Sequence, residues 1–68
     1  MEFKERLRQL RSEKNETQVQ VAEALGIQGR HYQRFELGEN LPGFANLIAL
    51  ADHFDVTLDY LMCRTDQR

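Results

Sequence analysis

The feature that most constrains the fold is a very short turn between two helical segments near Gly26. Thr17 and Gln20 have the spacing of a capping box, in which each side chain pairs with a free backbone N–H group at a helix start. Gly26 ends that helix, since glycine readily takes the left-handed conformation found at helix C-termini. Ile27 lies in the turn itself, and an apolar residue there is expected to be buried between the two helices. The apolar residues of this first helix of the pair are Val21, Ala22 and Leu25.

The second helix of the pair is predicted to run from residue 28 or 29 to Leu37. Tyr32 and Phe35, three residues apart, form its buried side, and Gly38 marks its end. The residues on its other faces are polar or basic. They are Gln28, Arg30, His31, Gln33 and Arg34.

An amphipathic segment precedes this pair. Phe3, Leu7 and Leu10 are spaced four and three residues apart, with basic residues between them. This spacing places the three apolar side chains on one face of a helix. The segment therefore predicts a helix that ends near Lys14.

Two more helices are predicted after the pair. Pro42 pushes Leu41 out of helical geometry, and a fourth, strongly apolar helix follows. Its core residues are predicted to be Phe44, Leu47, Ile48, Ala51 and Phe54. Thr57 is a suitable N-cap for a short fifth helix, with Asp59 in its first turn, where the helix dipole favours an acid. The apolar residues of this helix are Leu58, Leu61 and Met62.

These segments predict an all-α fold, a compact bundle of about five short helices joined by short loops. Because 68 residues can build only one hydrophobic core, residues 1–68 are expected to form a single domain. The helices cover roughly residues 3–62, and the tail 64–68 is expected to be frayed. So small a core adds little stability beyond the cost of chain entropy, which favours self-association.

The charges are distributed unevenly, although the formal net charge is −2. Residues 3–14 hold five basic and two acidic side chains, and residues 28–35 hold two arginines and a histidine with no acid. Residues 37–61 hold four acidic side chains and no lysine or arginine. One side of the molecule can therefore face phosphate while the other is acidic, so the net charge does not exclude a nucleic-acid partner.

Several classes of protein do not fit the sequence. The lone Cys63 cannot close an intramolecular disulfide, and no cysteine–histidine cluster has zinc-site spacing, so we expect a cytoplasmic protein without metal or cofactor. The longest apolar run, residues 47–51, is too short for a membrane span, and the charged N-terminus does not resemble a signal peptide. His31 and His53 have no evident nucleophile partner, and paired carboxylate motifs and glycine-rich phosphate loops are missing. We therefore do not expect an enzyme.

The cap, turn and core residues also form an ordered set along the chain. Its members are Thr17-Gln18, Ala22, Leu25-Gly26-Ile27, Glu36, Gly38, Pro42, Leu50-Ala51 and Val56-Thr57-Leu58-Asp59-Tyr60-Leu61. This set resembles the Cro/repressor (XRE-like) helix-turn-helix family over roughly residues 3 to 62. The resemblance implies a lambda-repressor-like domain in which the helix at 28–37 enters the major groove of DNA.

The resemblance implies base-facing or groove-facing positions for Gln28, Gly29, Arg30, Gln33 and Arg34. Arginine can fork onto guanine O6 and N7, and glutamine can pair with adenine N6 and N7. Arg30 and Arg34 rank first, because residues four apart project from one face and no acid precedes Glu36 in this segment. Gly29 weakens the helix start but allows close backbone approach to DNA. The alternative is an ordinary solvated surface helix.

Phosphate contacts are expected around this helix. The resemblance implies that Gln18 hydrogen-bonds a phosphate, helped by the positive end of its helix. Alternatively, Gln18 is a tolerated helix-start residue beside the capping Thr17. His31 fits either a phosphate contact or a structural place beside Tyr32. The candidates for phosphate contact are Thr17, Gln18, His31, Asn40, Gly43 and Phe44.

The resemblance also implies a buried or semi-buried ion pair between Arg11 and Glu36, which would join the first and third helices. Its role would be structural. Removing one charge would leave the other uncompensated and destabilise the domain.

The function predicted from these features is that of a sequence-specific transcriptional regulator. It would be a repressor that binds a pseudo-palindromic operator as a homodimer, with half-sites about 34 Å apart. The residues predicted at the dimer interface are Leu58, Tyr60, Met62 and Cys63, because the short fifth helix offers more apolar surface than its own core can cover. Alternatively, Leu58 and Leu61 only close the monomer core.

A second hypothesis is a helical protein-interaction module, such as an antitoxin or adaptor, that uses the acidic half of the surface. The two hypotheses differ in whether Arg30 and Arg34 are needed. In either case we expect no membrane partner and no small-molecule ligand domain.

Overall fold

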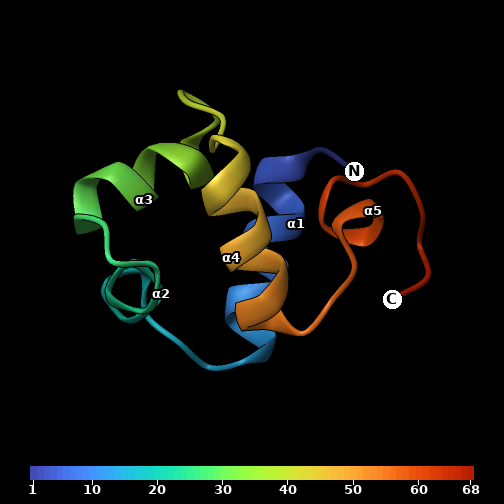
Figure 1. Ribbon diagram of the computed structural model, residues 1–68, viewed down its shortest axis with the longest axis horizontal. Coiled ribbons are helices and arrows are strands. Elements are labelled where there is room, and N and C mark those ends of the chain that lie inside the picture. The colour runs from blue at the N-terminus through green and yellow to red at the C-terminus, as the bar shows by residue number, and fades with distance from the viewer.

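The computed structural model describes all 68 residues and contains five helices and no strands (Figure 1). The helices are α1 (Phe3–Glu13), α2 (Gln18–Leu25), α3 (Gly29–Leu37), α4 (Phe44–Phe54) and α5 (Leu58–Leu61). The predicted all-α bundle of five short helices is therefore confirmed. None of the five is long and apolar enough to cross a membrane.

Local signals fix the ends of α2 and α3. Thr17 Oγ1 accepts a hydrogen bond from the backbone N–H of Gln20 at 3.1 Å, and Gln20 Oε1 accepts one from the N–H of Thr17 at 2.8 Å. These two bonds satisfy N–H groups that a helix start leaves unpaired, as the capping box predicted. Gly26 and Gly38 end α2 and α3 with φ of 72° and 80°, which glycine adopts without steric strain.

A single hydrophobic core lies between the helices. α2 packs against α3 and α4, α1 packs against α3 and α5, and α4 also packs against α5. Ile27 packs against this core from the turn but is only half-buried, so it is less enclosed than predicted. The buried core residues are Leu7, Leu10, Val21, Ala22, Tyr32, Phe35, Leu50, Ala51, Phe54, Tyr60 and Leu61.

The buried side of α4 differs from the predicted one. The prediction placed Phe44 and Ile48 in the core, but they are 76% and 38% exposed, whereas Leu50 is fully buried. At about 3.6 residues per turn, Ile48 lies on the opposite side of α4 from Leu50, whereas Phe44 is the first residue of the helix, about two turns before the buried Ala51. The prediction was wrong because apolar spacing alone does not decide which side of a largely apolar helix faces the core.

α5 is a single short turn that begins at the predicted cap. Thr57 Oγ1 accepts a hydrogen bond from the N–H of Tyr60 at 3.1 Å. Leu61 is fully buried, while Leu58 at the start of α5 stays 39% exposed. Met62 and Cys63, which follow the helix, are half-buried.

The tail after α5, which was expected to be frayed, folds back onto α1 in the structure. Arg68 pairs with Glu13 at 2.7 Å, and Asp66 pairs with the buried Arg6 at 3.5 Å. The guanidinium carbons of Arg6 and Arg68 lie 3.7 Å and 5.1 Å from the centroid of the Tyr60 ring. Cations attracted to the aromatic face thus help to cover Tyr60, which is only 4% exposed. The prediction that Tyr60 offers dimer surface is therefore wrong.

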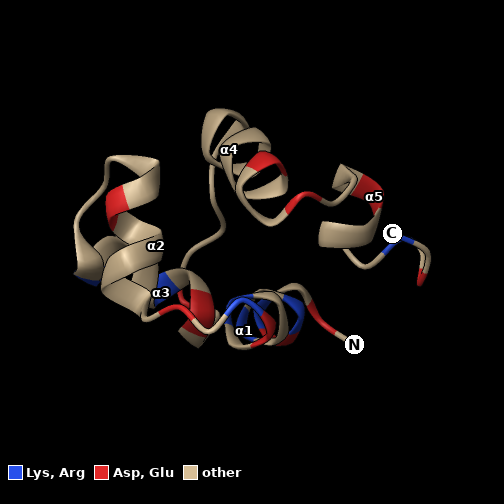
Figure 2. Cartoon of the chain, turned by 90° about the horizontal axis from the view of Figure 1, so that it is seen from below, with Lys and Arg blue, Asp and Glu red and all other residues tan.

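Among the five helices, lysine and arginine occur only on α1 and α3, which also hold acidic residues. Figure 2 shows basic residues concentrated on α1, with others on α3, whereas acidic residues alone appear on α4 and α5. α1 and α3 lie toward one side of that view and α4 toward the other. The uneven charge along the sequence therefore becomes an uneven charge across the molecule.

Candidate nucleic-acid interface

α3 has a buried side and an exposed side, and its two arginines lie on the exposed one. Tyr32, Phe35 and Glu36 are all at most 1% exposed. Arg30 and Arg34 are one helical turn apart and project away from that buried side, since a helix has about 3.6 residues per turn. Neither guanidinium group belongs to any ion pair within the chain. Both are therefore free to contact a partner.

The other predicted base-facing residues lie at the start and along the side of α3. Gln28 is the N-cap residue, with φ −72° and ψ 147°, and its exposed side chain makes no capping hydrogen bond. Gly29 is the first residue of the helix and is half-buried. Gln33 is exposed and lies beside Arg30, because residues three apart are neighbours on a helix surface.

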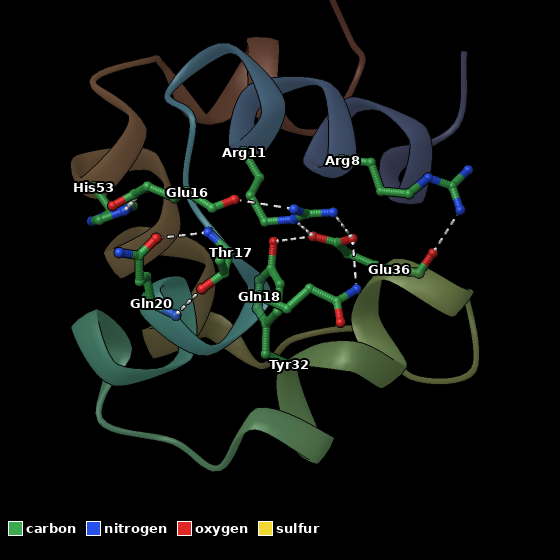
Figure 3. A network of polar contacts seen from close by, with 9 residues as sticks. All are labelled: Arg8, Arg11, Glu16, Thr17, Gln18, Gln20, Tyr32, Glu36 and His53. Carbon is green, nitrogen blue, oxygen red and sulfur yellow. Dashed lines mark hydrogen bonds and ion pairs between the residues drawn. The ribbon is translucent and has the colours of Figure 1, made fainter.

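The buried side of α3 is held by a polar network centred on Glu36 (Figure 3). Arg11 of α1 donates from Nε to Oε2 of Glu36 at 2.7 Å and from Nη2 to Oε1 at 3.0 Å. Gln18 of α2 donates to Oε1 at 3.0 Å, and the Tyr32 hydroxyl donates to Oε2 at 2.5 Å. The carboxylate thus accepts four hydrogen bonds from three helices, which offsets much of the cost of burying its charge.

The network changes the protonation properties of its members. Burial alone would raise the pKa of Glu36, but the hydrogen bonds from Arg11, Tyr32 and Gln18 hold that pKa below its ordinary value of 4.5. The same pairing raises the pKa of the Arg11 guanidinium. Burial, followed by the bond to Glu36, raises the pKa of the Tyr32 hydroxyl. Glu36 is therefore a carboxylate, and Tyr32 a neutral donor, at neutral pH.

Further bonds connect this network to the rest of the fold. Arg8 donates to the main-chain oxygen of Glu36 at 3.2 Å, near the C-terminus of α3. Arg11 donates to the main-chain oxygen of Glu16 at 3.1 Å, and the Glu16 carboxylate lies 2.7 Å from Nε2 of His53 on α4. Figure 3 shows these contacts running from α3 through α1 and the loop before α2 to α4. The orientation of α3 is thus tied to three other parts of the chain.

Gln18 occupies a position between the network and the surface. One N–H of its side-chain amide is used by Glu36, and the side chain is partly exposed. A primary amide has a second N–H, which remains available to a partner. Thr17 beside it is occupied as the cap of α2.

The remaining phosphate candidates lie on α3 and before α4. Gly43 is the N-cap of α4, without a side-chain cap, so the N–H groups of Phe44 and its neighbours at this helix start have no intrahelical partner. Asn40 is exposed in the loop between α3 and α4. The exposed His31 lies with its ring centroid 4.9 Å from that of Phe35.

Comparison with known proteins matches residues 7–61 to the family described as helix-turn-helix. The chain belongs to the Cro/repressor (XRE-like) helix-turn-helix family. The CTXphi phage transcriptional repressor RstR of Vibrio cholerae is 41% identical over 64 residues, which are 94% of this chain and 57% of that protein. The transcriptional regulator YqaE of Bacillus subtilis is 40% identical over 88% of this chain and 52% of its own length. The helix-turn-helix chain thus spans about half the length of these relatives.

Solved structures show the same fold. The DNA-binding domain of the P22 C2 repressor superposes with a TM-score of 0.84 at 26% identity, over 90% of this chain and 80% of that one. A transcriptional regulator from Listeria innocua superposes with a TM-score of 0.88 at 31% identity, over 98% of this chain and 63% of that one. The lambda-repressor-like architecture predicted from the sequence is therefore confirmed.

Two members of the Glu36 network were not predicted as such. Tyr32 was predicted only as a buried aromatic residue, and Gln18 only as a phosphate contact or a helix-start residue. A signal for Tyr32 was present, because Tyr32 and Glu36 are four residues apart and share a helix face. The contact of Gln18 joins separate helices, and no local spacing encodes it.

We predict that Glu36→Gln lowers the free energy of unfolding by about 3 kcal/mol, the lower end of the range for breaking a buried ion pair. The lower end applies because the Arg11 side chain remains 23% exposed and keeps some hydration. Thermal and urea unfolding at neutral pH measure this loss. Unchanged stability would contradict the structural role of the pair.

The loss should also depend on pH. Because the folded-state pKa of Glu36 is lowered, its stabilisation is complete above the ordinary value of 4.5 and disappears as pH falls through the lower folded-state pKa. The difference between the wild type and Glu36→Gln should therefore shrink with acid. Glu39→Gln, which changes an exposed carboxylate in the next loop, is the matched control and should show neither effect.

Proposed function

We propose that this domain binds double-stranded DNA in a sequence-specific manner and represses transcription, with α3 inserted in the major groove. The observation that carries the proposal is the pair of unpaired guanidinium groups, Arg30 and Arg34, on the side of α3 opposite its buried residues. A single helix fits the width of the major groove, where base edges are distinguishable. The regulators to which the chain is similar support the same role.

Four side chains, two arginines and two glutamines, would contact the base edges. Arg30 and Arg34 can each fork onto O6 and N7 of a guanine, and Gln28 and Gln33 can each pair with N6 and N7 of an adenine. The Glu36 network would hold α3 from behind, so that these side chains meet the bases from a fixed backbone. Such preorganisation reduces the entropy lost on binding.

Phosphate contacts would flank the recognition helix. The second N–H of the Gln18 amide is suited to donate to a phosphate while the first remains on Glu36. The free N–H groups at Gly43 and Phe44 lie at the positive end of α4, where anions are favoured. Asn40 and His31 would add polar contacts, and Thr17 would contribute chiefly by fixing the start of α2.

Sequence-specific contacts would supply a large share of the DNA affinity of a domain whose net charge is −2. Non-specific affinity comes mainly from Lys and Arg that displace counterions, and here Arg11 and Arg68 are engaged with Glu36 and Glu13. Binding of a second copy to a neighbouring half-site would compensate for this weak non-specific affinity. Once one subunit of a dimer is bound, the other is held near its own half-site at a high effective concentration.

The dimer proposed here uses exposed apolar residues of α4 and α5, which pack against each other. Leu58 keeps its predicted place in the interface, with Met62 and Cys63 at its edge. Tyr60 is replaced by Ile48, because Ile48 is 38% exposed and Tyr60 only 4%. A two-fold dimer of this kind suits a pseudo-palindromic operator with half-sites about one turn apart.

The DNA proposal is tested by Arg30→Ala combined with Arg34→Ala. Each arginine fork is worth about 1–3 kcal/mol, so affinity for the preferred duplex should fall at least about 30-fold while the unfolding temperature stays unchanged. Fluorescence anisotropy with labelled duplex at a fixed salt near 0.1 M measures the loss. Lys14→Ala combined with Arg64→Ala removes the same charge from exposed positions elsewhere and should lower affinity far less. Equal losses for both pairs would contradict base reading by α3.

The dimer proposal is tested by Leu58→Asp. A buried carboxylate at the interface should raise the dimer dissociation constant by about tenfold or more and leave the helical content unchanged. Sedimentation velocity over a range of concentrations measures the constant. Leu37→Asp, at a 52% exposed leucine of α3, is the matched control and should sediment as the wild type does. A dimer that survives Leu58→Asp would contradict this interface.

A further inference from the structure

Val19 is an exposed valine at the start of α2, beside the first residue of α3. Its side chain is 57% exposed, whereas Val21, two residues later, is fully buried. A Cβ atom placed on Gly29 would lie 3.7 Å from Cγ2 of Val19. The absence of a side chain at Gly29 thus leaves a methyl group of Val19 uncovered next to the start of the recognition helix.

Neither the backbone nor the available space requires glycine at position 29. Gly29 lies in α3 with an ordinary helical φ, unlike Gly26 and Gly38, which have positive φ. An added Cβ would meet Val19 at an ordinary van der Waals distance. Alanine would also be a better helix former than glycine. The consequence of glycine at this position is therefore that no side chain of residue 29 covers the Val19 methyl group.

We propose that Val19 and Gly29 together form a site that recognises the 5-methyl group of a thymine, an inference that rests on the proposed DNA binding. The thymine methyl is the apolar group that base pairs present in the major groove, and apolar contacts distinguish it from cytosine. Gly29 offers no side-chain donor or acceptor, so the side-chain contact at this position is the apolar one from Val19. Gln28 and Arg30 flank Gly29 in the sequence and read hydrogen-bonding edges on either side.

The experiment uses the duplex recovered by selection from random sequences, with each thymine replaced in turn by uracil, which lacks the methyl group. The wild-type domain should lose affinity about fourfold at one thymine of each half-site, as expected for one buried methyl group. Val19→Ala should bind the thymine duplex about fourfold more weakly and should no longer distinguish uracil from thymine at that position. Its unfolding temperature should match that of the wild type, because Val19 is largely exposed.

Two controls make the result specific. Leu37→Ala truncates another exposed apolar residue of this domain and should keep the full preference for thymine. A scan without any methyl-sensitive thymine, or a preference that persists in Val19→Ala, would overturn the assignment to Val19 while leaving DNA binding intact. A wild-type domain that binds no duplex at all would overturn the proposed function itself.

Discussion

The structure depends on one buried carboxylate. Glu36 is 1% exposed and accepts hydrogen bonds from Arg11, Gln18 and Tyr32, which come from α1, α2 and α3. An ionised group in this place would be strongly unfavourable without those donors. Because each donor must approach from its own helix, satisfying the carboxylate fixes the three helices relative to one another. The hydrophobic core holds the helices together, and the Glu36 network fixes the orientation of α1, α2 and α3 relative to one another.

That geometry supports the proposed role of α3 as a recognition helix, although α3 is short and begins with glycine. The polar network holds its buried side, and Arg8 adds a bond at its C-terminus. Arg30 and Arg34, on the opposite side, are left without partners in the chain. The arginines of α1 and of the tail are instead used for structure. This division of the arginines makes the negative net charge compatible with the proposed nucleic-acid interface.

Features that depend on neighbouring residues were predictable from the sequence, and features that depend on distant ones were not. The cap at Thr17 and the glycine at Gly26 act within a few residues, so the helix boundaries followed from them. The exposure of Ile48 depends on the rotation of α4 about its own axis, which brings Leu50 into the core. The packing of the other helices sets that rotation. The cover over Tyr60 comes from Arg6 and Arg68, far away in the sequence at opposite ends of the chain. For the candidate interface, the exposure of the arginines on α3 was predictable, whereas the hydrogen bond from Gln18 to Glu36 was not.

The central claim is that a fixed α3 reads DNA sequence, and selection from random duplex DNA at a stated salt concentration tests it most directly. The account predicts enrichment of a motif with two related half-sites about one helical turn apart, containing guanines at the positions that face the arginines. Enrichment should strengthen as salt is raised toward about 0.2 M, since non-specific phosphate binding weakens first. Recovery of random sequences at every salt concentration would contradict the account.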